Sequence, residues 1–212
     1  TENGDVQVRK ANSLTTSTGW ASPFGTTALD NTAANEAYRP SLALKTDNNP
    51  IVAWYEDVGT SFNIYAKEWN GTAWVALGTT IDKTASRDAK DIVLAIRTDN
   101  RPVVAWEEAG NVYVKRWTGT SWVSLGGVLD EVSANEALRP AIDLRTDNNP
   151  VVTWQEWNGS SYDVLVKRWT GSTWTLVANV ADKNLSRDAE RPSLVLKSDN
   201  NPIISWDEWD GT

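Results

Sequence analysis

A tandem repeat of about 50 residues limits what this chain can fold into more than any other feature of its sequence. Four related segments, each ending in the pattern Trp-x-Glu, occupy 39–56, 91–108, 139–156 and 191–208 of the 212 residues. A repeat of this length is one supersecondary unit that cannot bury its apolar face alone and stacks on its neighbours. The chain is therefore a solenoid, a propeller or an array.

Each repeat is predicted to form four short strands. In the first repeat these strands are 41–45, 51–56, 64–69 and 74–77. Asn and Asp residues with a Pro separate the first two strands, and an Asn-Gly or Thr-Gly dipeptide separates the last two, which is typical of tight turns. Four strands per unit is the blade of a β-propeller. The predicted fold is all-β, a four-bladed β-propeller with four-stranded blades.

The order of strands at the two termini predicts how the ring closes. Residues 5–10 align with 111–116, which is a third strand, and Trp20 takes the place of Trp122 in a fourth strand. Residues 203–208 are a second strand, so we expect a blade split between the N- and C-termini, which removes the exposed sheet edge. The alternative is that two chains share blades in a larger ring. The predicted single domain spans 1–212, with blade 1 at 31–82, blade 2 at 83–130, blade 3 at 131–182 and blade 4 at 183–212 plus 1–30.

Composition excludes several classes of function. The chain has no His and no Cys, which rules out Ser-His and Cys-His nucleophiles and disulfides. A net charge of −8 argues against nucleic-acid binding. There is no apolar run of about 20 residues, so we expect no membrane insertion. The prominent carboxylates are equivalent copies, whereas a glycosidase needs two in unlike environments. We expect a protein that is not an enzyme.

The repeat motifs carry a resemblance to a known group of proteins. They read Asn-Pro-Ile-Val-Ala-Trp at 49–54 and Val-Lys-Arg-Trp-Thr-Gly at 114–119 and 166–171. The chain resembles bacterial surface or secreted tandem-repeat β-propellers and, more distantly, lectin propellers. The resemblance implies a secreted or cell-surface location, here for a mature chain without a signal peptide. No sugar-binding motif of the lectins matches residue by residue, so no site is carried over.

Aromatic residues that are not repeated are the candidate ligand-binding groups. Trp157 and Trp209 stand where the other repeats have Asp57 and Ala109, in the loop between strands two and three. The same loops contain Tyr162 and Phe62, and exposed aromatic rings there could stack on sugars or contact a partner protein. The alternative is that these rings only shield the core from solvent.

Two sets of repeated acids are further candidates. Glu156 and Glu208, with Glu56 and Glu108, follow the strand-two Trp and would either pair with the strand-three cation or form a ring of polar sites for a hydroxyl-rich ligand. A second set would ring one mouth of the channel, where carboxylate oxygens bind Ca²⁺ or Mg²⁺ or pair with nearby Arg. That set is Glu36, Asp88, Glu136 and Asp188. No cofactor is expected beyond such a structural Ca²⁺.

The predicted function is non-enzymatic extracellular binding. Weak identical sites on repeated blades gain avidity when one ligand engages several of them. The expected partner is a glycan, in a lectin-like manner, or a protein surface. The alternative is a structural or adhesive scaffold unit of a larger surface protein or filament, which would self-associate through its faces.

Overall fold

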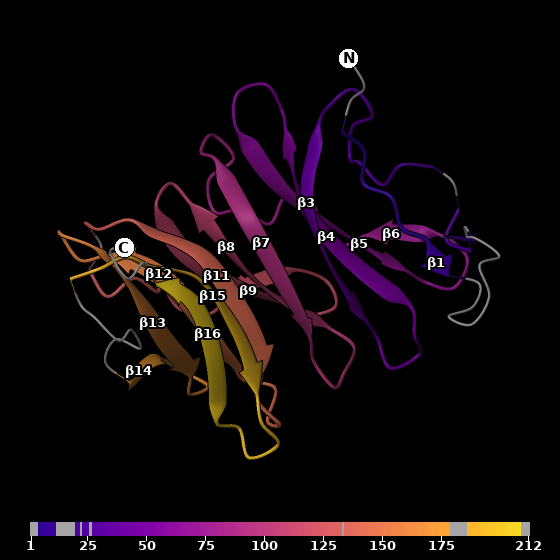
Figure 1. Cartoon of the computed structure of the whole chain (residues 1–212). Helices are drawn as coiled ribbons and strands as arrows, with labels where there is room; N and C mark the ends of the chain where they lie inside the picture. The colour runs from indigo at the N-terminus through magenta and orange to yellow at the C-terminus, as the bar shows by residue number, and fades with distance from the viewer. Residues whose placement is uncertain are drawn as a thin grey trace.

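The computed structural model describes residues 4–11, 20–21, 23–25, 27–132, 134–178 and 186–208, and in these ranges every regular element is a β-strand (Figure 1). Three four-stranded antiparallel sheets follow one another, and we call them blades 1, 2 and 3. Blade 1 has β3 (Ala37–Leu44), β4 (Pro50–Asp57), β5 (Phe62–Trp69) and β6 (Trp74–Ala76). Blade 2 has β7 (Ala89–Ile96), β8 (Pro102–Glu108), β9 (Asn111–Trp117) and β10 (Trp122–Ser124). Blade 3 has β11 (Ala137–Leu144), β12 (Pro150–Trp157), β13 (Tyr162–Trp169) and β14 (Trp174–Ala178).

Two further sheets have two strands each. We call β1 (Lys10–Ala11) and β2 (Trp20–Ala21), with the preceding residues 4–9, the N-terminal half-blade. The C-terminal half-blade is β15 (Ala189–Leu196) and β16 (Pro202–Glu208). The predicted all-β fold with repeated four-stranded antiparallel blades is confirmed.

The turns form where the sequence predicts them. Between strands one and two, Asn48 has a φ of 64°, which Asn tolerates better than most residues, and Pro50 opens the next strand. Between strands three and four, Gly71 has a φ of 104°. The hairpin around it pairs Trp69 with Trp74. Local chemistry therefore sets the registers within each blade.

Strand one begins four residues earlier than predicted, because it contains a β-bulge. In blade 1 the register shifts between Tyr38 and Ser41. The bulge places Arg39 at a φ of 43°, which is uncommon for a side chain of this size. The equivalent bulge residues have φ values of 50°, 53° and 54°, and they are Asp91, Arg139 and Arg191. These innermost strands pack side by side along the array.

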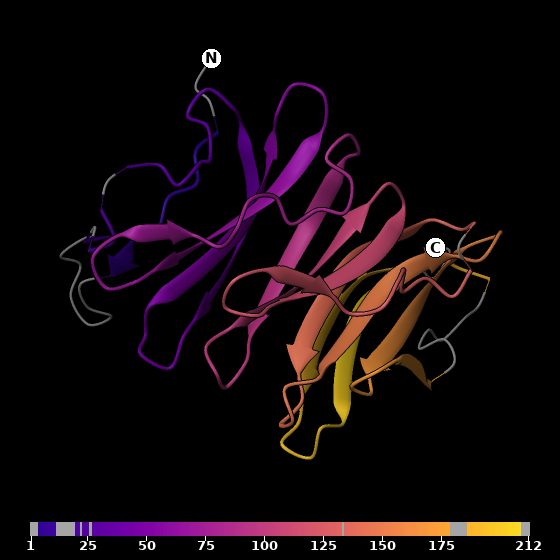
Figure 2. The same cartoon turned by 180° about the vertical axis from the view of Figure 1, so that it is seen from behind.

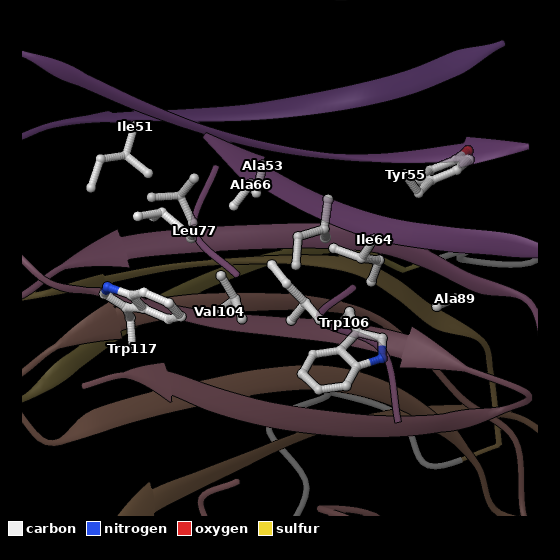
Figure 3. Close-up of a cluster of buried hydrophobic side chains, with 13 residues drawn as sticks. Ile51, Ala53, Tyr55, Ile64, Ala66, Leu77, Ala89, Val104, Trp106 and Trp117 are labelled. Carbon is white, nitrogen blue, oxygen red and sulfur yellow. The ribbon is translucent and has the colours of Figure 1, made fainter. Parts of the chain in front are cut away.

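The core consists of the layers between successive blades. Trp54, Trp106 and Trp154 of strand two are at most 1% exposed and belong to this interblade core. Figure 3 shows the cluster between blades 1 and 2, to which blade 1 contributes Ile51 and Ile64 and blade 2 contributes Val104 and Trp106. Each blade is therefore stabilised mainly by its neighbours.

The N-terminal half-blade takes the place of a third and fourth strand in front of blade 1. The Leu29 amide donates to the Val6 carbonyl at 3.0 Å, just as Leu129 donates to Val112 at 2.9 Å between blades 2 and 3. Val6 packs in one cluster with Val52 and Trp54. In the backbone register, Ala11 pairs with Trp20. These contacts agree with the alignment of residues 5–10 with a third strand and of Trp20 with a fourth, although within 4–11 only Lys10 and Ala11 are strand residues.

Closure of the ring is not confirmed. Figures 1 and 2 show β1 and the β15–β16 pair at opposite ends of the row of blades. Among the described residues β16 pairs with β15 alone, and β1 with β2 alone. Closure requires the rotations between successive blades to add up to a full turn. That sum depends on small differences in packing at every junction, which the motif of a single blade does not specify.

Candidate functional site

The predicted ligand residues gather at one end of the blades, where strand two ends and strand three begins. We call this end the loop face; it comprises the loops 57–62, 109–111 and 157–162 and the connections that lead into each strand one. Trp209 lies outside the described residues. No helix in the described ranges has the length and apolar character needed to cross a membrane.

Blade 3 presents a pair of aromatic rings on the loop face. Trp157 ends β12 and Tyr162 begins β13, and the two residues are cross-strand partners. Their ring centroids are 5.3 Å apart with an interplanar angle of 66°, and both side chains are half-buried. This edge-to-face geometry is a favoured one for aromatic pairs. Of the predicted ligand residues, these two are the ones that the structure brings together.

Two carboxylates hold this aromatic pair in place. The Tyr162 amide donates to Asp188 Oδ1 at 3.0 Å, and the Tyr162 hydroxyl donates to Glu136 Oε2. The hydrogen bond to the Glu136 carboxylate raises the pKa of Tyr162 to about 12. Tyr162 is therefore a neutral donor at physiological pH. The two carboxylates add acceptors beside the rings.

At the matching position in blade 1, the ring of Phe62 packs against other side chains of the protein. The Phe62 ring lies 5.4 Å from Tyr55 and 5.9 Å from Tyr38, in both cases edge to face. The Lys90 ammonium lies over the same ring at 4.6 Å from its centroid. Phe62 was a predicted ligand residue, but its contacts are with blade 1 and the cation of blade 2. In blade 2 the loop is the short turn at Ala109 and Gly110.

Glu156 is a buried structural acceptor. It is 3% exposed, and its carboxylate accepts from the amides of Glu131 at 2.9 Å and Val132 at 2.7 Å and from Trp154 Nε1 at 2.8 Å. Burial leaves it no surface for a ligand, in contrast to the sequence-based expectation. Glu208 accepts in the same way from Trp206 Nε1 at 3.2 Å. In blades 1 to 3 the acid recurs because it ties strand two to the connection that precedes its own blade.

The repeated cation of strand three also has a different partner from the predicted one. Lys67 Nζ donates to the carbonyl of Leu29 and lies 5.7 Å from the ring centroid of Trp54. Lys167 donates to the carbonyl of Leu129 in the same way. These cations therefore hold the connections between blades through backbone oxygens.

The four acids predicted to ring the channel mouth do not converge on one point. Glu36 accepts from the Tyr38 hydroxyl, and Asp88 accepts from Lys90 at 3.1 Å. Glu136 and Asp188 both bind Tyr162, as described above. In the described part of the chain no three carboxylates come close enough together to hold a metal ion. The acids bind tyrosines, backbone amides and Lys90, and not the arginines expected as alternative partners.

A pocket where the four inner strands meet was missed at the sequence level. Its volume is about 370 Å³, and the bulge residue of every blade lines it. Arg39 pairs with Asp91, Arg139 Nη1 lies 3.9 Å from Glu190, and Arg191 Nη1 lies 3.3 Å from Asp207. The cations are thus neutralised by nearby acids, which leaves a polar surface without a strong field. The repeated Arg-Pro dipeptides that lead into strand one were the available signal.

A further repeated carboxyl group lies beneath the loop face. Asp130 is 7% exposed, and its Oδ1 accepts from the Val112 amide at 2.9 Å. Its Oδ2 has no hydrogen-bond partner among the described residues, and the same holds for Asp30 and Asp82. Burial raises the pKa of Asp130 to about 6, although the Val112 amide acts in the opposite direction. These groups belong to the interblade core.

Comparisons with known proteins show which solved structures have a similar fold. No family model and no curated protein matches the chain. A protein of unknown function from Dyadobacter fermentans is similar, with a TM-score of 0.63 and 13% identity over 84% of this chain and 63% of that one. An α-L-arabinanase from Penicillium chrysogenum, solved with arabinobiose, has a TM-score of 0.57 and 10% identity over 81% of this chain and 57% of that one. An endo-arabinase from Bacteroides thetaiotaomicron has a TM-score of 0.50 and 13% identity over 80% of this chain and 69% of that one.

These likenesses concern the fold alone, since all identities are far below 25%. The chain spans less than two thirds of the length of the first two of these structures. The repeated four-stranded sheets match structures with the propeller fold.

Proposed function

We propose that this protein is a non-enzymatic binding module that recognises a carbohydrate at the loop face of blade 3. The observation that carries the proposal is the Trp157–Tyr162 pair, which stands where blade 1 has Asp57 and a Phe62 that contacts Lys90. Blade 2 has a short turn there. Repetition explains the aromatic residues of the core, but it does not explain this Trp–Tyr pair, which within the described residues occurs on blade 3 alone.

The chemistry of this surface suits a sugar. Aromatic rings present an apolar face to the C–H groups of a pyranose or furanose ring, and carboxylates accept hydrogen bonds from hydroxyl groups. Glu136 and Asp188 supply such acceptors next to Tyr162. The polar pocket at the centre of the inner strands opens near the same end, because Arg139 lies only two residues after Ala137, the partner of Glu156 in the sheet. A glycan that extends from the aromatic pair toward the axis would therefore meet polar groups.

The roles of the acids near this site support binding without catalysis. A glycosidase divides two roles between carboxyl groups in unlike environments. Glu136 and Asp188 hold the same tyrosine, and the buried Glu156 holds backbone amides. The propeller fold is shared with the endo-arabinase and the α-L-arabinanase, and that likeness extends to the fold only. We further propose a secreted or cell-surface location, which follows from the resemblance of the repeats.

A glycan panel with matched variants tests this function. Trp157→Asp places at the site the residue that blade 1 tolerates at the same position. We expect a glycan that binds the native protein to lose about fivefold or more in affinity, since one stacking aromatic contributes about 1–3 kcal/mol and about 1.4 kcal/mol is tenfold. Val123→Ala, on the outer strand of blade 2 and 40% exposed, is the control and should leave affinity unchanged. Binding that Trp157→Asp leaves intact would refute the site.

A scaffold role is the second candidate function, and a different observation favours it. Leu42 and Ile203 at the two ends of the array are more than 50% exposed. At the same positions inside the array, Leu94 and Ile51 are buried. The two roles are compatible, because the loop face and the ends of the array are separate surfaces.

A further inference from the structure

The two ends of the array expose apolar faces. At the N-terminal end Leu42 and Leu44 of β3 are each 56% exposed. At the C-terminal end Val195 of β15 is 53% exposed and Ile203 of β16 is 55% exposed. We call the first surface the leading face and the second, together with Ser205, the trailing face.

The internal junctions show what such faces contact. Between blades 1 and 2, Ile51 and Ala53 pack in one cluster with Leu94 and Ile96 of β7. Ile203 and Ser205 hold the positions of Ile51 and Ala53 in the repeat, and the two leucines of the leading face hold those of Leu94 and Ile96. Ile51 is 0% exposed and Leu94 is 9% exposed. The trailing face is thus one side of an interblade junction, and the leading face is the other.

A polar contact repeated at every internal junction confirms this complementarity. The Thr46 amide donates to Asn100 Oδ1 at 2.7 Å, and Asn100 Nδ2 donates back to Thr46 Oγ1 at 2.9 Å. The same two-bond clamp joins blades 2 and 3 and joins blade 3 to the C-terminal half-blade. Its residues there are Thr98 with Asn148, and Thr146 with Asn200.

The two ends of the array hold one half of this clamp each. Ser198 occupies the Thr position on the C-terminal half-blade, and Asn48 occupies the Asn position on blade 1. Asn48 has a φ of 64°, the same value as Asn100, which forms the clamp between blades 1 and 2. The backbone of Asn48 therefore already has the conformation that the clamp requires. The clamp partners missing from one end are the residues present at the other.

The unpaired strand edges are complementary as well. In blade 1, β4 pairs with β5 in the register Ala53 to Ala66. β16 is a second strand without a third, and the segment 4–11, of which Lys10–Ala11 are strand, takes the place of a third strand without a second, as far as the described residues extend. The same register would pair Ser205 with Val8. A groove of about 610 Å³, lined by Val8, Leu42 and Asn48 among others, lies open on this side of blade 1.

We propose that copies of this chain join head to tail, with the trailing face of one copy on the leading face of the next. The junction would complete a composite blade from β15 and β16 of one copy and the N-terminal half-blade of another. A second copy is the occupant that fits because the two faces of one chain lie at opposite ends of the array (Figures 1 and 2), held apart by three packed blades. Such a heterologous interface produces either a closed ring of copies or a filament.

Complementary blocking variants test the direction of assembly. Leu42→Lys places a charge on the leading face and Ile203→Lys on the trailing face; both positions are more than half exposed, so each variant should fold. We expect the native chain to form higher-mass species with rising concentration in analytical ultracentrifugation. Each variant alone should stay monomeric, and an equimolar mixture should form a dimer that grows no further, since each partner keeps one intact face. A native chain that remains monomeric up to about 100-fold the concentration used for the variants overturns the proposal.

Cysteine pairing distinguishes a second copy from closure within one chain. The chain has no Cys, so Val8→Cys and Ser205→Cys can be introduced singly, and the Cα spacing of paired strand residues suits a disulfide. Mixing the two single variants under oxidising conditions should give a covalent species of twice the chain mass. If the mixture gives none while the double variant closes within one chain, copies do not join and the split blade forms intramolecularly. Glycan binding is read separately on Trp157, so either result leaves that proposal standing.

Discussion

The internal junctions and the ends of this array have nearly the same sequence and very different surroundings. Ile51 and Ile203 stand at the same position of the repeat, yet one is 0% exposed and the other 55%. Trp54 is fully buried, whereas Trp206 is half-buried. The difference is the neighbouring blade. A repeat of this kind supplies half of each junction, and its stability comes from what lies against it.

The same substitution at the two isoleucines should separate these environments most clearly. Ile51→Ala removes buried methylene and methyl groups from the packed layer between blades 1 and 2, so we expect it to lower the free energy of unfolding by about 2–5 kcal/mol. Ile203→Ala should cost less than about 1 kcal/mol, because the side chain is largely in water. Urea unfolding followed by Trp fluorescence, at a concentration where the chain is monomeric, measures both.

Equal effects at the two positions would contradict this comparison. They would mean that β16 is covered in the monomer, as ring closure within one chain requires. Val195→Ala, at 53% exposure on the same face, is the control for any local effect of the Ile203 change.

The internal junctions should also carry most of the pH dependence of stability below pH 6. The folded pKa of Asp130 is about 6, above its ordinary value of 3.8, because the carboxyl group is buried. The folded state therefore binds the proton more tightly than the unfolded state. Stability from this group is complete below about pH 4 and is lost as the pH rises toward 6. The shift corresponds to at most about 3 kcal/mol at 1.4 kcal/mol per pH unit.

Asp130→Asn tests that assignment, because the amide oxygen can still accept from the Val112 amide. We expect the decline in melting temperature between pH 4 and pH 6 to become smaller in this variant. Burial also raises the pKa values of Asp30 and Asp82, so part of the decline should remain. An unchanged profile would show that Asp130 is ionised in the folded protein throughout this range.

The sequence predicted the parts of this fold that local chemistry determines. Turn residues such as Asn48 and Gly71 and the flanking pair of Trp69 and Trp74 are enough to place four strands per repeat. The early start of strand one was not predicted, because a bulge at Arg39 interrupts the apolar pattern. Closure was not predictable either, since it depends on the angle between blades, which many weak contacts set together.

The residues of the candidate site, too, could be predicted from the sequence only in part. Trp157 and Tyr162 could be found from the sequence because they depart from the repeat, and departure from a repeat needs its own reason. The sequence did not reveal that Glu156 is buried, because a repeated acid shows the same pattern whether it faces a ligand or accepts hydrogen bonds from buried amides. The central pocket was missed because its lining comes from four repeats that meet only in the folded chain.

The clamp between blades gives the finest test of the difference between junction and end. Asn148→Ala removes two hydrogen bonds to Thr98, of 2.7 and 2.9 Å, across the junction of blades 2 and 3. Each such bond contributes about 0.5–1.5 kcal/mol, so we expect the loss of both to lower the free energy of unfolding by about 1–3 kcal/mol. The substitution also places Ala in the left-handed region, which has a cost of its own.

Asn48→Ala provides the correction for that cost, because Asn48 has a φ of 64° and Asn148 a φ of 65°. In the monomer Asn48 faces the open leading face, so its substitution should cost only the backbone term, and the difference between the two variants measures the clamp. In assembled copies the prediction reverses: Asn48→Ala should then weaken association, because its clamp with Ser198 of the next copy is lost. A monomer destabilised equally by both substitutions would show instead that the clamp contributes nothing and that the apolar layers alone hold the blades together.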